Sequence, residues 1–403
     1  MLDALQNQTL TMTGPGTPLG DVFRRYWHPV ALSNEVTPGG KPKQLRIMGE
    51  DLVLFRPDEG QPGLLALHCS HRLTSLAYGR VEDGGIRCPF HGWLYDVAGR
   101  CLQQPGEPEE SSFKDKIRHP AYPCRELGGL IFAFMGPADK RTPLPSFEAL
   151  VRGDGTRLAD SYVINSNWLQ NLEGALDPIH SVYLHMDKWS EVKDIVLTQP
   201  KVDVSLKVAD FGIWRRSYGP RPYKTTMLPS YGHFFLPTGF IGIRRDALRE
   251  GVMYKHQSWY TPIDDEHCIK FTVAFTPKSA TGGAEIDYGI SKEGYVAPGP
   301  ENDYFRNYEE VDTLSGIPVR AHAKTAVKGL LAQDSMVNET QGAIVDRTKE
   351  HLAATDLLLI MTRKMLQQAV NDVGEGRDPK FSNPEPDDEG MVRVNGDDEF
   401  ELR

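Results

Sequence analysis

Residues 68–93 read HCSHRLTSLAYGRVEDGGIRCPFHGW. This stretch contains Cys69-x-His71, then sixteen residues, then Cys88-x-x-His91. Almost no hydrophobic periodicity accompanies these residues, which is typical of loops rather than of long helices or strands. The pattern therefore predicts two short loops, each of which presents one cysteine and one histidine to a shared inorganic group.

Two kinds of inorganic group fit four such ligands. A tetrahedral zinc ion binds mixtures of Cys and His, whereas a [2Fe–2S] cluster accepts two His in place of two Cys on one iron. Zinc fingers commonly place both Cys on one loop, but this order places one Cys and one His on each loop. The order favours the histidine-ligated cluster, and structural zinc remains the alternative.

A second candidate metal site lies further along the chain, where residues 165–189 read NSNWLQNLEGALDPIHSVYLHMDKW. Asp177, His180 and His185 form D-x-x-H-x-x-x-x-H. Two imidazoles and a carboxylate are the ligands of non-haem Fe(II), with positions left open for O2. Because His180 and His185 are about 140° apart on an ideal helix, they converge only where the helix is broken or bulged. Asp177-Pro178 predicts such a boundary, with Asp as N-cap.

The two motifs together resemble those of the Rieske non-haem iron ring-hydroxylating oxygenases. The family has the pattern C-x-H-R, C-x-x-H-G-W and then D-x-x-H-x-x-x-x-H about 90 residues later. The similarity extends along the chain to the phthalate dioxygenase branch, which includes phthalate and phenoxybenzoate dioxygenases and 5,5′-dehydrodivanillate O-demethylase. It rests on GPGTPLGDVFRRYWHPVAL, NWLQNLEGALDPIHSVYLH and ETQGAIVDRTKEHL. This resemblance implies an enzyme, with an electron-transfer Rieske protein as a less favoured reading.

The resemblance also implies roles for individual residues. It assigns a [2Fe–2S] Rieske cluster to the four residues of the first motif, namely Cys69, His71, Cys88 and His91. It assigns a mononuclear Fe(II) to His180, His185 and a later carboxylate. For that carboxylate we choose Asp334, because Asp334 and Glu339 resemble a D-x-x-x-x-E pattern of relatives, and Asp346 is the competitor.

In the family the Asp of the second motif is not an iron ligand. It bridges to the Rieske domain of a neighbouring subunit, so the resemblance implies that Asp177 faces His91 of another chain in a head-to-tail homotrimer or stacked trimers. Glu173 is expected on the helix surface or as a support of the iron ligands.

The resemblance and the hydrophobic patterns predict an α+β fold. It comprises an N-terminal all-β Rieske domain and a C-terminal helix-grip-like antiparallel sheet with helices. Residues 200–280 alternate between apolar and polar, which predicts strands, and residues 325–372 are expected to be helical. The expected parts are an N-terminal helical segment and entry at 1–45, the Rieske domain at 46–145, the catalytic domain at 146–372 and an acidic flexible or wrapping tail at 373–403.

The composition of the 403-residue chain argues against several other classes of protein. Its net charge of −10 argues against nucleic acid as a partner. No signal peptide or membrane-spanning run is visible, which predicts a cytoplasmic protein. An odd count of five cysteines argues against a disulfide framework, and Cys101, Cys124 and Cys268 are expected to be buried structural residues.

The substrate and partners follow from the resemblance and from an absence in the sequence. No G-x-G-x-x-G follows a strand, so NAD(P)H is expected to act through a separate reductase or ferredoxin. The expected substrates are O2 and an aromatic carboxylate. The preferred reaction is O-demethylation of a methoxylated, lignin-derived aromatic acid with release of formaldehyde, and cis- or angular ring dioxygenation is the alternative.

Candidates to hold the carboxylate are Arg215, Arg216, Arg221, Arg244, Arg245 and Lys255. Phe234, Phe235, Phe240 and Trp259 are candidates for a pocket or, preferably, for core packing.

Overall fold

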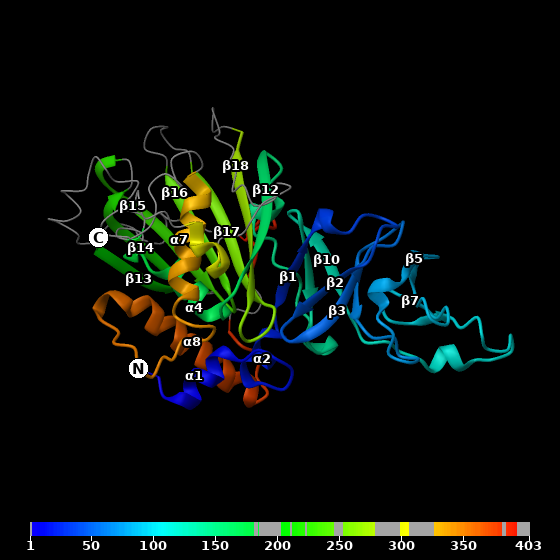
Figure 1. Cartoon of the computed structure of the whole chain (residues 1–403). Coiled ribbons are helices and arrows are strands. Elements are labelled where there is room, and N and C mark those ends of the chain that lie inside the picture. The colour runs from blue at the N-terminus through cyan, green and yellow to red at the C-terminus, as the bar shows by residue number, and fades with distance from the viewer. Residues whose placement is uncertain are drawn as a thin grey trace.

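The computed structural model describes residues 2–180, 184, 203–209, 212–221, 224–245, 253–278, 299–305, 326–380 and 384–392. An N-terminal β domain extends to the right of a larger domain, in which helices cover an antiparallel sheet (Figure 1). The predicted α+β class is therefore confirmed.

The N-terminal domain is built from three small antiparallel sheets, with strand orders β1-β11-β10, β2-β3-β4-β9 and β5-β6-β7-β8. Their strands are β1 (Trp27–Leu32), β2 (Lys43–Ile47), β3 (Glu50–Phe55), β4 (Gly63–Ala66), β5 (Arg80–Glu82), β6 (Gly85–Arg87), β7 (Leu94–Asp96), β8 (Cys101–Gln103), β9 (Ala121–Tyr122), β10 (Cys124–Leu127) and β11 (Leu130–Phe134). The strands β5, β6 and β7 have only three residues each, which explains why this stretch shows little periodicity.

The turn between β2 and β3 joins the two domains. Met48 and Gly49 both have positive φ, 47° and 77°, as two-residue hairpin turns require. The backbone N–H of Met48 donates to Pro262 O at 2.8 Å, and that of Gly49 donates to Ile263 O at 2.9 Å. The turn of this hairpin is therefore hydrogen-bonded to the larger domain.

The larger domain contains a seven-stranded antiparallel sheet with strand order β12-β18-β17-β16-β15-β14-β13. Its strands are β12 (Gly155–Ile164), β13 (Asp203–Ala209), β14 (Gly212–Arg221), β15 (Lys224–Phe235), β16 (Gly239–Arg245), β17 (Met253–Pro262) and β18 (Cys268–Pro277). This result confirms the antiparallel sheet predicted in residues 200–280 and adds β12 at its edge.

Each face of this sheet carries its own hydrophobic core. Phe234 and Phe240 belong to the core on the helix side, whereas Phe235 and Trp259 belong to a second core, and both cores also contain residues of the N-terminal domain. Successive side chains of a strand point to opposite faces, which explains the division. These four aromatic residues are therefore core residues and do not line one common pocket.

Within the described residues the α-helices are α1 (Ala4–Thr11), α2 (Pro18–Phe23), α3 (Glu148–Val151), α4 (Trp168–Leu176), α7 (Ala326–Glu339) and α8 (Leu357–Gly374). In Figure 1, α7 crosses the front of the sheet and α8 lies below it with α1 and α2. Among the described helices, none combines the length and apolar composition needed to cross a membrane.

The expectation that residues 325–372 are helical is confirmed for α7 and α8 but is wrong between them, where residues 340–353 are not helical and Ala354–Asp356 form only a short 3-10 helix. Gly342 has a φ of +97° within this break. The break is also bonded to α4, since Asn167 N donates to Ala343 O at 2.7 Å.

The described part of the C-terminal tail wraps back over the molecule. Tyr26 donates its hydroxyl to Lys380 O at 3.1 Å. Val392 forms a parallel bridge with Phe147 and accepts a backbone hydrogen bond from Glu148 at 3.0 Å. These contacts tie the tail to segments near both domains.

Candidate metal centres

Backbone hydrogen bonds close the two Cys/His loops at the far end of the N-terminal domain. The N–H of Cys69 donates to Thr74 O at 2.9 Å, and that of Cys88 donates to Trp93 O at 2.8 Å. Gly92 has a φ of +74°, which favours glycine, and its N–H donates back to Cys88 O at 3.1 Å. Each cysteine therefore begins a tight loop that returns directly to its own start.

The four candidate cluster ligands lie together but differ in exposure. Cys69 and Cys88 are buried, at 1% and 3% exposed, whereas His71 and His91 lie on the surface with ring centroids 4.5 Å apart. His71 also stacks on Trp93, with centroids 4.4 Å apart and an interplanar angle of 4°. This arrangement fits one iron between two buried thiolates and a second iron between two exposed imidazoles.

The same geometry bears on the zinc alternative. Among the described residues, no three His, Cys, Asp or Glu side chains converge on one ion position. The ligands are paired instead, with the two thiols buried and the two imidazoles exposed, as a histidine-ligated diiron cluster requires.

The surroundings of the cysteines suit a bound metal cluster. Burial raises the pKa of the Cys88 thiol, the backbone N–H groups of Phe90 and His91 oppose this rise, and the Cys69 thiol adds to it. A free thiolate is therefore disfavoured, and a bound cationic metal would supply the missing stabilisation. The Tyr95 hydroxyl lies 3.2 Å from Cys69 Sγ. The short motif did not indicate this contact.

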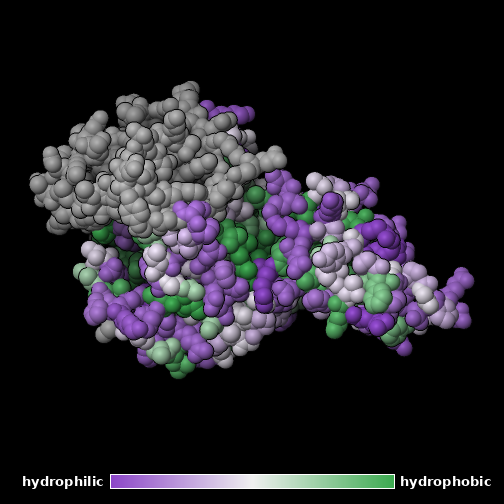
Figure 2. All heavy atoms as spheres, viewed as in Figure 1, coloured by the Kyte–Doolittle hydropathy of each residue, from purple (hydrophilic) through white to green (hydrophobic). Residues whose placement is uncertain are grey.

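The surface around the histidines is mixed in character. Leu73, Tyr78 and Phe90 are exposed large hydrophobic residues of this region, and Arg72 lies over the Phe90 ring at 5.2 Å. Figure 2 shows separate green groups on the otherwise mainly hydrophilic N-terminal end at the right. The candidate cluster therefore lies close to solvent at an accessible end of the molecule.

The second candidate centre begins where α4 ends. Asp177 Oδ1 accepts a hydrogen bond from Ile179 N at 2.7 Å, and Oδ2 accepts one from His180 N at 3.1 Å. The N–H of Leu184 then donates to His180 O at 2.7 Å, which is helical spacing. The predicted chain boundary at Asp177-Pro178 is confirmed, with the Asp carboxylate capping the turn that carries His180.

His180, which follows α4, lies close to Asp334 of α7 on the face of the sheet that the helices cover. His180 Nε2 lies 3.8 Å from Asp334 Oδ1, and both side chains are partly exposed. The ligand atoms of one metal ion are separated by a distance similar to that between His180 Nε2 and Asp334 Oδ1, because each ligand atom lies about 2 Å from the metal. His185 lies outside the described residues. The structure therefore brings together His180 and Asp334 of the three proposed ligands.

The competitor Asp346 has a different environment. Its carboxylate accepts hydrogen bonds from Thr348, with Oγ1–Oδ1 2.6 Å, and pairs with Lys349 at 2.9 Å. These contacts lower the pKa of Asp346 to about 2. The side chain is thus engaged by its own turn, whereas Asp334 faces His180.

Glu173 is not on the helix surface, and that part of the expectation is wrong. Its side chain is buried and pairs with Arg347 and Arg363. Burial raises the pKa of its carboxyl, but the charges and hydrogen bonds of the two arginines outweigh burial, so that the pKa lies below its ordinary value. A buried Glu needs such partners, but nothing near it in the sequence identified them.

Of the basic residues of the sheet that are candidates to bind the substrate carboxylate, two have side chains that the structure describes. Arg215 is buried and donates from Nη1 to Leu176 O at 2.6 Å, at the end of α4. Cations are favourable at a helix C-terminus, so Arg215 stabilises the helix end beside Asp177. Arg216 follows Arg215 on β14 and hence points to the other face. The remaining basic candidates, Arg221, Arg244, Arg245 and Lys255, have side chains outside the described set.

All five cysteines are buried free thiols, as expected for a chain without a disulfide framework.

The sequence matches two protein-family models. Residues 26–122 match the Rieske [2Fe-2S] domain, and residues 251–386 match the LigXa C-terminal domain like family. The oxygenase subunit of 5,5′-dehydrodivanillate O-demethylase from Sphingobium sp. (strain NBRC 103272 / SYK-6) is 33% identical over 391 residues, which cover 94% of this chain and 83% of that protein. The chain belongs to the Rieske non-haem iron oxygenases.

Other members show the same extent of similarity. The oxygenase subunit of phthalate 4,5-dioxygenase from Pseudomonas putida is 32% identical over 394 residues, covering 92% of this chain and 86% of the relative. The solved structure of Pseudomonas putida CBB5 NdmA superimposes with a TM-score of 0.68 at 18% identity, covering 91% of this chain and 96% of that one. The first similarity supports membership in the family, and the second shows the shared fold.

Several expectations are thereby confirmed. This Rieske oxygenase is an oxidoreductase with a Rieske [2Fe–2S] domain, and its family implies a mononuclear iron. Relatives that are oxygenase subunits also imply O2 as a substrate and a separate electron-transfer partner. The reading as an electron-transfer protein alone does not account for similarity along the whole chain.

Proposed function

We propose that this Rieske oxygenase removes a methyl group from a methoxylated, lignin-derived aromatic carboxylate and releases formaldehyde. The observation that carries the proposal is the 33% identity, along 94% of the chain, to a subunit named as an O-demethylase. The approach of His180 to Asp334 supplies a place for the oxidation. Ring cis- or angular dioxygenation is the second candidate, because an equally extensive relative is named as a dioxygenase.

The proposed metal ligands divide between the two domains. Within residues 46–145, the cluster is assigned to Cys69, His71, Cys88 and His91. Within residues 146–372, the iron is assigned to His180, His185 and Asp334. A ferrous ion with two imidazoles and a carboxylate supplies positions for O2 beside the substrate. The chain contributes fixed ligand directions, since Asp177 caps the turn of His180 and Trp93 stacks on His71.

The arrangement of the two sites supports a head-to-tail homotrimer or stacked trimers. The loops near β5 and β7 lie at the far end of the N-terminal domain, whereas α4 and α7 lie on the catalytic sheet (Figure 1). His91 is exposed, and the side chain of Asp177 is partly exposed. A ring in which His91 of one chain faces Asp177 of the next brings the centres together and closes without a free interface.

The proposed electron supply is external. Electrons from NAD(P)H are passed by a separate reductase or ferredoxin to the cluster in the cytoplasm. His71 and His91 are exposed, so an electron donor docked at this surface would be in direct contact with two of the proposed cluster ligands.

Arg215 is the least suited of the candidates to bind the substrate carboxylate, because it already donates to the end of α4. We therefore favour Arg216, Arg221, Arg244, Arg245 or Lys255, since a guanidinium or ammonium group pairs with a carboxylate.

A product screen tests the reaction. The purified oxygenase is combined with a generic reductase, NADH and a panel of aromatic acids with and without methoxy groups. O-demethylation consumes one O2 and one NADH for each formaldehyde and phenol formed, with water as the other product. We expect formaldehyde only from methoxylated acids and only when reductase is present.

Two results contradict the preferred reaction. Formation of a ring diol without formaldehyde supports the dioxygenase candidate instead. NADH consumption without any oxidised aromatic product, across the whole panel, argues that the substrate is not an aromatic acid.

A further inference from the structure

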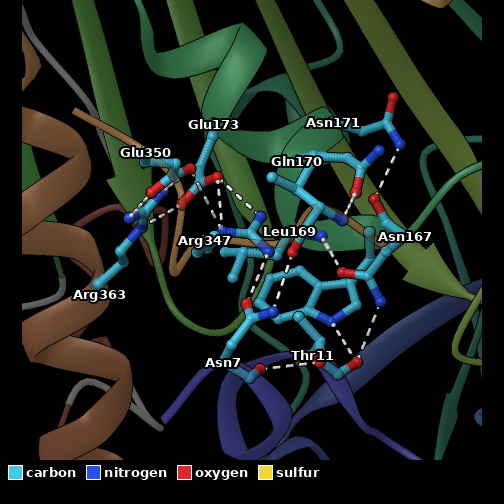
Figure 3. Close-up of polar contacts among 12 residues, drawn as sticks. Asn7, Thr11, Asn167, Leu169, Gln170, Asn171, Glu173, Arg347, Glu350 and Arg363 are labelled. Carbon is cyan, nitrogen blue, oxygen red and sulfur yellow. Dashed lines mark hydrogen bonds and ion pairs between the residues drawn. The ribbon is translucent and has the colours of Figure 1, made fainter. Parts of the chain in front are cut away.

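A buried ionic network joins α4 to chain segments that follow α7. Glu173 accepts hydrogen bonds from Arg347 Nη2 at 2.8 Å and from Arg363 Nε at 2.5 Å (Figure 3). Arg363 also makes two contacts with Glu350, with Nη1–Oε2 2.6 Å and Nη2–Oε1 3.0 Å. Arg347 is fully buried. The network therefore sets two positive charges against two negative charges inside the catalytic domain.

Such a network is not needed for stability alone. Apolar side chains of similar volume usually stabilise a core as well as buried ion pairs do, because the ions lose their hydration. Hydrogen bonds between charged groups are directional. They are satisfied only when the two chain segments that carry the charges have one particular relative position. The network in this protein is thus suited to fixing the position of α4.

A second set of contacts fixes the same helix to the end of α7. Gln170 Nε2 donates to Asn338 O and to Gly342 O, both at 2.8 Å, and Gln170 Oε1 accepts from Val345 N at 3.0 Å. At Gly174 an added Cβ would lie 3.2 Å from the Asn338 amide. Helices α4 and α7 therefore approach each other closely, and Gln170 bonds to both sides of the turn after α7.

These contacts flank the two candidate iron ligands. Glu173 lies one turn before Asp177 on the helix that leads to His180, and Asn338 lies one turn after Asp334 on α7. A helix rotates by about 100° and rises by about 1.5 Å per residue. A slip of one residue between α4 and α7 therefore removes the approach of His180 Nε2 to Asp334 Oδ1, now 3.8 Å.

We propose that Gln170 and the Glu173–Arg347 pair are positioning residues, which hold α4 and α7 in the one register that lets His180 and Asp334 reach the same iron ion. This inference rests on the proposed function, in which His180 and Asp334 are iron ligands. The positioning residues act through helix placement, as hydrogen bonds behind a metal ligand orient that ligand.

Fe(II) affinity tests the inference independently of turnover. The probe is Fe(II) itself, titrated anaerobically against a competing chelator into protein whose Rieske cluster is intact. Gln170→Leu preserves volume and leaves no buried charge unpaired. We expect it to bind Fe(II) about 10–100-fold more weakly than wild type, the usual loss when support behind a ligand is removed. Glu173→Gln is expected to weaken binding in the same direction, and both variants are expected to keep the visible spectrum of the cluster.

Asn171→Leu is the matched control, one residue further along α4. The Asn171 amide donates to Ser166 Oγ and to Asn167 O, both at 2.9 Å, at the start of the same helix. The substitution removes comparable buried hydrogen bonds without touching the link to α7. We expect a lower melting temperature with Fe(II) affinity close to that of wild type.

The possible results separate failure of the positioning role from failure of the proposed iron site. Wild-type affinity in folded Gln170→Leu and Glu173→Gln overturns the positioning role, and so does an equal loss in Asn171→Leu, which indicates general loosening of α4. If Glu173→Gln does not fold, Gln170→Leu decides alone. If wild type binds no iron beyond the cluster, or His180→Ala binds it equally tightly, the proposed function itself has failed.

Discussion

His180→Ala is expected to lower turnover by at least about 100-fold, more than the roughly 10–100-fold that loss of a supporting group costs a metal site. The imidazole is one of three proposed ligands, and its Nε2 is the atom that approaches Asp334. Its side chain is partly exposed, so we expect the free energy of unfolding to fall by about 1 kcal/mol or less. Steady-state oxidation of the best substrate and thermal unfolding measure the two effects.

His267→Ala is the matched control for this prediction. His267 is partly exposed and contacts Asp264 at 2.8 Å, in the turn between β17 and β18. The substitution removes a histidine from the same domain without touching α4 or α7, and we expect turnover near wild type. Full activity of His180→Ala contradicts the assignment of the iron site.

Cys88→Ser is expected to abolish the Rieske cluster and therefore all reductase-dependent turnover. The proposed cluster ligands lie on the two loops that begin at Cys69 and Cys88, and hydroxyl oxygen is a poor replacement for a thiolate on iron. Because metal binding is coupled to folding of its loops, the N-terminal domain is also expected to unfold at a lower temperature. The visible absorbance and the iron and sulfide content of the purified variant measure the loss.

Cys101→Ser is the control for Cys88→Ser, because Cys101 lies in the same hydrophobic core. Cys101 is buried beside Cys69 and Cys88, and its thiol donates to Gln103 O at 3.6 Å, a contact that a serine hydroxyl retains. We expect full cluster content and normal turnover. Equal loss of the cluster in both variants argues that Cys88 matters for packing rather than as a ligand.

The parts predicted best from sequence are those determined by short-range patterns. The paired Cys/His loops follow from spacing alone, and the end of α4 follows from Asp177-Pro178. Strands β13 to β18 lie within residues 200–280, where alternation between turns predicted strands. Each of these features depends on residues that are neighbours in the chain, so a single sequence contains the information.

Long-range contacts explain what was missed. Glu173 lies 174 residues from Arg347 and 190 residues from Arg363, and no local pattern shows that these three side chains meet. The apolar pattern of 325–372 continues past the end of α7, whereas hydrogen bonds from α4 stabilise the break around Gly342. Sequence resemblance selected Asp334 over Asp346, and only the structure shows that Asp334 faces His180.

Iron and acid-labile sulfide analysis of the purified chain tests most directly whether its two ligand sets hold two distinct iron centres. We predict about three irons and about two sulfides per chain, two of the irons in the cluster and one at the two-histidine, one-carboxylate site. Zinc without sulfide contradicts the assignment of the first centre, and about two irons with two sulfides in fully reconstituted protein contradicts the second.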